Sequence, residues 1–135
     1  MSVVAGWVER IGLPEWGVEG LAAKLDTGAR TSAIHVEHLE EIDPDTIAFD
    51  VMLDRADPHH HVHVVTKWAR RTVIRSSNGV PQSRYVVKTT LKMGPIEREI
   101  EISLVSRRNM RRRMLIGRTA LSDVLVDSTR TYRLD

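Results

Sequence analysis

The alternation of residue types between Ile96 and Leu104 constrains the fold of this chain more than any other feature. The even positions are apolar except for Arg98, and the odd positions are Glu or Ser; this is the period of a strand with one buried face. The preceding run, Tyr85–Lys92, is rich in β-branched residues, and the intervening Met-Gly-Pro at 93–95 is typical of a tight turn. The sequence therefore predicts a β-hairpin over residues 85–105.

Most of the remaining pattern is also of strand type. The run Ile47–Leu53 alternates with its apolar residues on one face, and Val62–Val65 and Thr72–Arg75 are shorter candidates. Only the segment Thr119–Leu125 has helical character. A chain of 135 residues fits one domain, so we expect a single domain over residues 1–135. We expect it to be mostly β, with about seven or eight short strands.

The composition excludes several classes of protein. The chain has no cysteine, so it has no disulfide framework, thiolate nucleophile or Cys-ligated zinc. No apolar run approaches the roughly 20 residues that span a bilayer, and the N-terminus lacks the layout of a secretory signal. We therefore expect a cytoplasmic protein that does not bind membranes.

The net charge of +2 conceals a polarity along the chain. Residues 1–65 carry 4 Lys+Arg and 12 Asp+Glu (−8), and residues 66–135 carry 16 and 6 (+10), which sum to +2. Three interpretations are open: the halves fold against each other, two subunits meet with opposite charges, or the basic half binds nucleic acid.

The segment Ala22–Ala29 (Ala-Ala-Lys-Leu-Asp-Thr-Gly-Ala) is the first that indicates chemistry. A small apolar strand ends at Asp26, and Gly28 lets another backbone or a substrate approach the carboxylate closely. Taken alone, Asp-Thr-Gly is also common in ordinary β-turns. A second segment, Met114–Arg118 (Met-Leu-Ile-Gly-Arg), places two apolar residues before Gly117, 91 residues after Asp26 (117 − 26).

Together the two segments resemble one half of a retropepsin-like aspartic protease. The resemblance is to a bacterial and archaeal family catalogued as ATP-dependent zinc proteases, and it covers nearly the whole chain, from Gly6 to Tyr132. It implies a mostly all-β, retropepsin-like closed β-barrel with one short C-terminal helix, and a hydrolase activity. The matching passages are Lys24–His35, Ser76–Gly79, Arg84–Val86, Met114–Arg118 with Ala120–Leu121, and Val126–Asp127.

The resemblance implies that Asp26 is catalytic, with Thr27, Gly28, Ala29 and Gly117 supporting it. Aspartic proteolysis needs two carboxylates about 3 Å apart that share one proton. The chain has a single Asp-Thr-Gly, and the nearest second candidate, Asp127-Ser-Thr, lacks the glycine. We therefore expect a homodimer with a two-fold axis between the two Asp26 side chains, across which the Thr27 hydroxyls bond.

An active cleft of this kind needs a cover that pairs with extended peptide. The turn formed by Ser76, Ser77, Asn78 and Gly79 is our candidate for the tip of this flap; an ordinary surface hairpin is the alternative. The sequence also departs from many retroviral enzymes, because Arg30 and Thr31 follow Ala29 in place of acidic residues. Arg118 must therefore have a partner other than the viral one.

Four of the six histidines lie together, in His59-His60-His61 and His63. On a strand, His59, His61 and His63 would share one face and could bind zinc. The cluster lies outside the passages that match the family, which favours a solvated loop or strand edge. There is no His-Glu-x-x-His and no phosphate-binding Gly-x-x-x-x-Gly-Lys loop. We expect no zinc, ATP or other cofactor.

The run 107–113 contains five arginines in seven residues. It is either a solvated connection or a clamp for an acidic partner. Members of the family accompany ATP-grasp ligases that add glutamate, so the resemblance implies such a ligase as a partner and a Glu-rich or glutamylated peptide or protein as the substrate. A nucleic acid is disfavoured, because no Phe or Tyr lies between positions 86 and 131. The candidate substrate contacts are Arg30, Arg108, Arg113 and Arg118.

Four functions remain open at this stage. The leading one is a homodimeric aspartic peptidase; the others are a peptide-binding or regulatory module on the same fold, a zinc-dependent peptidase and a nucleic-acid binder. An intact Asp-Thr-Gly favours the first, because a binding module needs no paired carboxylates.

Overall fold

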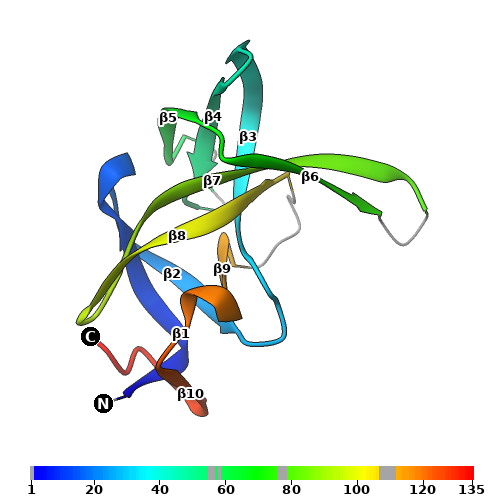
Figure 1. The fold of residues 1–135 in the computed structure, drawn as a ribbon. Coiled ribbons are helices and arrows are strands. Elements are labelled where there is room, and N and C mark those ends of the chain that lie inside the picture. The colour runs from blue at the N-terminus through cyan, green and yellow to red at the C-terminus, as the bar shows by residue number, and fades with distance from the viewer. Residues whose placement is uncertain (1, 55–56, 58, 76–78, 107–111) are drawn as a thin grey trace.

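The computed structural model describes residues 2–54, 57, 59–75, 79–106 and 112–135 (Figure 1). Within these residues the chain forms ten strands and two single-turn 3-10 helices, η1 (Pro14–Trp16) and η2 (Arg118–Ala120). The strands are β1 (Val3–Leu13), β2 (Val18–Asp26), β3 (Ser32–Asp43), β4 (Thr46–Met52), β5 (His61–Lys67), β6 (Arg70–Arg75), β7 (Pro81–Met93), β8 (Ile96–Val105), β9 (Met114–Gly117) and β10 (Val124–Thr131).

Six of these strands close a barrel in the order β1-β2-β9-β3-β8-β7, and the pair Gly12↔Lys92 joins β7 back to β1. The expected retropepsin-like closed β-barrel is therefore confirmed. Three pairings are parallel (β1–β10, β2–β9 and β3–β8). Strands β4 and β5 extend β3 into a second, smaller sheet.

The predicted hairpin over residues 85–105 is present as β7 and β8. Met93 pairs with Ile96 across a two-residue loop, in which Gly94 has a φ of 56°. The apolar positions of β8 are buried as the alternation requires. Arg98, the exception in that pattern, donates hydrogen bonds to the carbonyls of Ala120 (3.4 Å) and Ser122 (2.9 Å). It therefore satisfies carbonyl groups at the end of η2 that would otherwise lack a partner.

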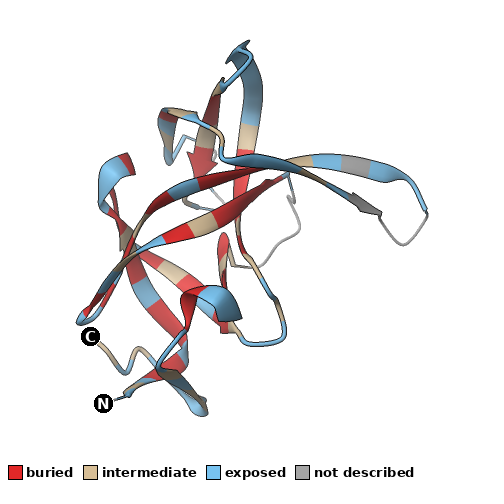
Figure 2. Cartoon of the chain, viewed as in Figure 1, coloured by how far each residue is buried: buried red, intermediate tan, exposed pale blue. Residues whose placement is uncertain are grey.

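The core is formed by buried residues of the barrel strands and of β4 and β5 in the smaller sheet (Figure 2). It consists largely of Val, Ile, Leu, Ala and Met, and Trp16 packs edge-on against Phe49 with ring centroids 5.5 Å apart. Strand β4 is buried almost throughout, because β3 and β5 flank it and the core lies beneath it.

The expected short C-terminal helix is present as a single turn at 118–120, and it does not continue to residue 125. Only the turn η2 forms there, and Val124 already begins β10, which pairs in parallel with β1 from Val3. The apolar residues 124–126 therefore extend the sheet instead of forming a helical face. No helix among the described residues has the length and apolar character needed to span a membrane.

Strands β6 and β7 extend beyond the barrel as a two-stranded arm (Figure 1). Val86 pairs with both Ser103 of β8 and Arg70 of β6, whereas residues 81–85 pair with β6 alone. Residues 70–75 and 81–85 therefore form a ribbon that leaves the barrel at Val86. Of the proposed flap residues, Gly79 is exposed with a φ of 79°, and Ser76, Ser77 and Asn78 lie outside the described residues.

Candidate active site

Asp26 is the last residue of β2, at one end of the barrel, and is half-buried. The Gly28 amide donates a hydrogen bond to Oδ1 of Asp26 at 3.0 Å, and the Ala29 amide donates to the Asp26 carbonyl at 3.1 Å. These two bonds form a tight turn that fixes the carboxylate relative to its own backbone. Oδ2 accepts no hydrogen bond from the residues that the structure describes, so it can accept one from a water or another carboxyl group.

Gly117 lies beside Asp26 in the parallel pair β2–β9. A Cβ on Gly117 would lie 2.6 Å from the Thr31 carbonyl carbon and 2.9 Å from the Ser32 nitrogen, both backbone atoms. Only glycine therefore allows the chain leaving the Asp26 turn to cross this closely. The Gly117 amide donates to the buried Ser32 hydroxyl at 3.0 Å, which joins the two segments at their closest point.

The residues after Gly117 bind the Asp26 loop from its other side. The Arg118 amide donates to the Ala29 carbonyl at 2.8 Å, and both the amide and the hydroxyl of Thr119 donate to the Arg30 carbonyl. Ser32 and Thr119 were not predicted as site residues. Ser32 lies inside the passage that matches the family, but nothing in its spacing distinguishes it from a turn hydroxyl.

The comparisons with known proteins agree with this geometry. Residues 4–134 match the family described as "Retropepsin-like aspartic endopeptidase RimB". The chain belongs to this RimB-like family. The expected family resemblance is therefore confirmed over nearly the whole chain, and the domain is an aspartic protease-like one.

Several relatives carry a different kind of name. A "Probable alpha-L-glutamate ligase" of Desulfotalea psychrophila is 32% identical over 126 residues, which are 91% of this chain and 27% of that protein. A protein of the same name from Shewanella pealeana is 31% identical over 97% of this chain and 30% of its own length. The chain thus spans less than a third of these relatives.

A solved structure shares the fold. The crystal structure of Lpg0085, a Legionella pneumophila protein of unknown function, superposes with a TM-score of 0.81 over the full length of both chains. The two sequences are 24% identical, so this similarity establishes the architecture of the RimB-like chain and nothing about its reaction.

Asp127, the second candidate for the carboxylate pair, has a different environment from Asp26. Its Oδ1 accepts hydrogen bonds from the amide (2.9 Å) and the hydroxyl (2.6 Å) of Thr129, and its Oδ2 lies 3.5 Å from Arg130. The bonds from Thr129 lower the pKa of the Asp127 carboxyl below its usual range, and Arg130 and Arg133 add to the shift. A carboxyl held ionised in this way is poorly suited to share a proton.

The predicted substrate arginines have different environments. Arg30 and Arg118 are exposed and lie on the two segments that meet at the Asp26 loop; neither makes an ion pair with a described residue. Arg113 is only 6% exposed, which does not fit a solvated connection, the first of the two interpretations of this run. Arg108 lies outside the described residues.

His61 and His63 lie on β5, His59 precedes this strand, and all three are exposed. His63 Nδ1 lies 2.8 Å from Asp50 Oδ1, and His38 Nδ1 lies 2.9 Å from Asp50 Oδ2. No group of three or more potential metal ligands occurs in the part of the chain that the structure describes. Burial favours the neutral form of Asp50, but the hydrogen bonds from His63 and His38 outweigh it and lower the pKa of this carboxyl.

Proposed function

We propose that this chain is an aspartic-type peptidase that works as a homodimer, with Asp26 of each copy as the catalytic pair. One observation carries the proposal: the Asp26 carboxylate stands at a strand end in a loop fixed on both sides, with Oδ1 bonded to Gly28 and Oδ2 without a partner among the described residues. The chain supplies one such carboxylate, and Asp127 is bonded within its own turn. A second copy would complete the pair.

In the proposed reaction, one Asp26 carboxylate is ionised and the other protonated. The ionised carboxylate takes a proton from a water molecule, whose oxygen attacks the scissile carbonyl carbon, while the protonated carboxyl donates its proton to the carbonyl oxygen. A proton then passes from the first carboxyl to the amide nitrogen as the C–N bond breaks, and a hydroxyl of the tetrahedral intermediate returns its proton to the second carboxylate, which restores the pair to one ionised and one protonated carboxyl. No covalent intermediate with the protein forms.

We propose a Glu-rich or glutamylated peptide as the substrate. Arg30 and Arg118 support this because both are exposed beside the Asp26 loop, and guanidinium groups bind carboxylates in a bidentate geometry. The name of the longer relatives also connects this domain with glutamate ligation. On this proposal the partner of the chain is a glutamate ligase, and the peptidase removes residues that such a ligase adds.

The first experiment is cleavage of a mixed peptide library, read by mass spectrometry at several pH values with and without EDTA. We expect the wild type and Asp127→Asn to cleave equally, Asp26→Asn to be inactive, and EDTA to have no effect. Cleavage by Asp26→Asn would overturn the assignment. Loss of activity with EDTA would favour a zinc-dependent peptidase, and binding without cleavage would favour a peptide-binding module.

The shared site has its own test. Wild type and Asp26→Asn are unfolded together in equal amounts and refolded; if both copies supply a carboxylate, random pairing leaves about half of the wild-type chains in active dimers. Activity per wild-type chain should therefore fall by about half. Full activity per wild-type chain would mean that one copy suffices.

Substrate class is tested with peptides in which Gln replaces Glu. We expect the wild type to cleave the Glu peptides at least about tenfold faster, and Arg30→Gln with Arg118→Gln to remove most of that preference. An unchanged preference in the double variant would exclude these two arginines as its source.

A further inference from the structure

The arm formed by β6 and β7 is joined to the barrel at a narrow base. From Tyr85 to Pro81, β7 pairs only with β6, and β6 pairs only with β7 within the described strands. A two-stranded ribbon is marginally stable on its own and twists readily. The direction of the arm therefore depends on the side chains that hold its base.

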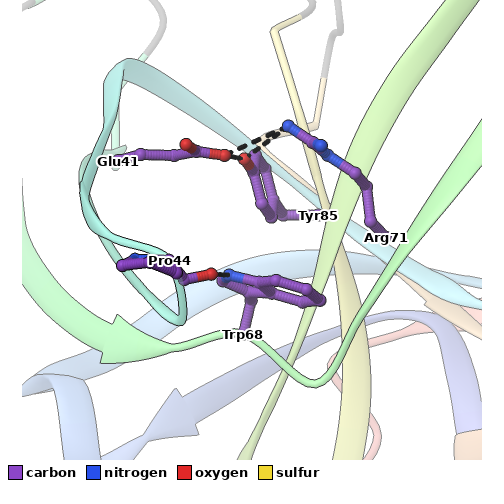
Figure 3. Close-up of polar contacts among 5 residues, drawn as sticks. All are labelled: Glu41, Pro44, Trp68, Arg71 and Tyr85. Carbon is purple, nitrogen blue, oxygen red and sulfur yellow. Dashed lines mark hydrogen bonds and ion pairs between the residues drawn. The ribbon is translucent and has the colours of Figure 1, made fainter.

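Tyr85, the first residue of β7 outside the barrel ladder, lies at the centre of these contacts (Figure 3). Its hydroxyl donates to Oε1 of Glu41 and accepts from Arg71 at 2.8 Å, while Arg71 also donates to the same Glu41 oxygen at 3.1 Å. The Arg71 guanidinium lies over the Tyr85 ring, 4.9 Å from its centroid. Although Glu41 and Arg71 are half exposed, Tyr85 is only 7% exposed, so the shared hydroxyl is largely shielded from water.

A second contact joins the same two parts of the molecule. Trp68, which connects β5 to β6, packs edge-on against Tyr85 with ring centroids 5.7 Å apart. Its indole nitrogen donates to the Pro44 carbonyl at 3.1 Å (Figure 3). Glu41 and Pro44 both belong to the β3–β4 hairpin. The base of the arm is thus bonded to this hairpin at two points that share one aromatic pair.

We propose that Glu41, Arg71 and Tyr85, here called the Tyr85 cluster, are positioning residues that set the direction of the β6–β7 arm relative to the barrel, and that this direction favours the binding of peptide. The substrate-binding part of this inference rests on the proposed function. The positioning part does not, because the three side chains bond the arm to the β3–β4 hairpin whether or not the chain is a peptidase. None of them touches the reacting atoms.

The chain offers a matched control. Arg10 lies over the ring of Tyr132 at 4.2 Å and pairs with Asp135 at 3.2 Å. Arg10 therefore makes the same two contacts as Arg71, one with an aromatic ring and one with a carboxylate, at a place remote from the arm. Tyr85→Phe and Arg71→Met remove the hydroxyl and the charge of the Tyr85 cluster, and Arg10→Met removes the corresponding charge elsewhere.

The direction of the arm can be measured without catalysis. Because the chain has no cysteine, nitroxide labels can be attached to Val80→Cys on the arm and Ser122→Cys at the Asp26 end of the barrel. Pulsed electron paramagnetic resonance then gives their distance distribution, with an excess of unlabelled chain so that each labelled chain reports only its own pair. We expect one narrow peak in the parent and in Arg10→Met, and a distribution at least about twice as broad in Tyr85→Phe and Arg71→Met.

Charge reversal supplies the rescue. Glu41→Arg alone should broaden the distribution, and the addition of Arg71→Glu should narrow it again, because the Tyr85 hydroxyl can accept from one partner and donate to the other. Unchanged distributions in Tyr85→Phe and Arg71→Met would overturn the proposal. Equal broadening in Arg10→Met would also overturn it, because the effect would then be general.

Kinetics test the connection to substrate. If the Tyr85 cluster raises the fraction of molecules with a correctly directed arm, its loss should raise KM by about tenfold and leave kcat within about twofold. A broadened arm with unchanged KM would overturn the role in substrate binding. An inactive parent with a broadened arm in the variants would reject the proposed peptidase function while the positioning role holds.

Discussion

Gly117→Ala tests whether the close crossing at the Asp26 loop holds the site together. The added Cβ would lie 2.6 Å and 2.8 Å from the Thr31 carbonyl carbon and oxygen, and 2.9 Å from the Ser32 nitrogen. All three are backbone atoms, so no side chain can rotate away. The two segments must separate, which strains the bond from the Gly117 amide to Ser32 and that from the Arg118 amide to Ala29.

These losses can be summed approximately. Overpacking in a tight core costs about 1–3 kcal/mol, and each of the two hydrogen bonds contributes about 1 kcal/mol. Gly117→Ala should therefore lower the free energy of unfolding by about 3–5 kcal/mol, which is a large part of the roughly 5–15 kcal/mol typical of a domain. The midpoint of thermal unfolding should fall by about 10 °C or more.

The assay is urea and thermal unfolding followed by circular dichroism, with Gly12→Ala as the control. A Cβ at Gly12 would lie 3.4 Å from the Val18 carbonyl oxygen, close to ordinary contact, so the control should change stability by less than about 1 kcal/mol. Fits of unfolding curves have an error of about 1 kcal/mol. If the free energies of unfolding of Gly117→Ala and Gly12→Ala differ by less than this, the two segments separate more easily than the geometry implies and the reasoning fails.

Two further predictions concern carboxylates outside the candidate active site. Glu9 is fully buried, and its carboxylate accepts hydrogen bonds from the amides of residues 6, 133 and 134. Glu9→Gln should therefore cost about 2–4 kcal/mol in urea unfolding, against less than about 0.5 kcal/mol for the exposed Glu19→Gln; equal effects would contradict this role. Because the folded-state pKa of Asp50 lies below its usual value of 3.8, its contribution to stability is complete above about pH 5 and is lost as the pH falls through the folded-state pKa. Asp50→Asn should remove that part of the acid dependence, measured as unfolding free energy from pH 7 to pH 2, and an unchanged slope would show that His63 and His38 do not stabilise the carboxylate.

The sequence predicted the strands correctly where the alternation of apolar and polar residues runs over a long enough segment to identify the buried face. The alternation in Ile96–Leu104 and the Gly-Pro turn predicted the β7–β8 hairpin, because each strand shows its buried face in its own residues. The sequence predicted only part of Thr119–Leu125, where one helical turn forms and a strand follows, because so short a segment does not distinguish a helix from a strand. Pairing with β1 across the length of the chain decides that segment.

The candidate site was only partly predictable for a similar reason. The residue types around Asp26 and Gly117 indicated that the two segments meet, and the pair β2–β9 joins them. The bonds from Ser32 and Thr119 depend on which carbonyl or amide lies opposite, and no spacing encodes this. Likewise, Glu41 and Tyr85 are brought together by the register of two hairpins, which neither residue reveals alone.

The position of β9 has a consequence for the order in which the molecule can assemble. This four-residue strand lies between β2 and β3, yet it begins 88 residues after the end of β2 (114 − 26) and 71 residues after the end of β3 (114 − 43). During synthesis one edge of β2 and one edge of β3 therefore remain unpaired until β9 leaves the ribosome. One edge of β1 remains unpaired for longer, until β10 has also emerged. Such distant pairings give a high contact order, for which folding in milliseconds to seconds is typical. The growing chain should accordingly depend on chaperones that shield exposed strand edges, and it should acquire protease resistance only after residue 117 has emerged.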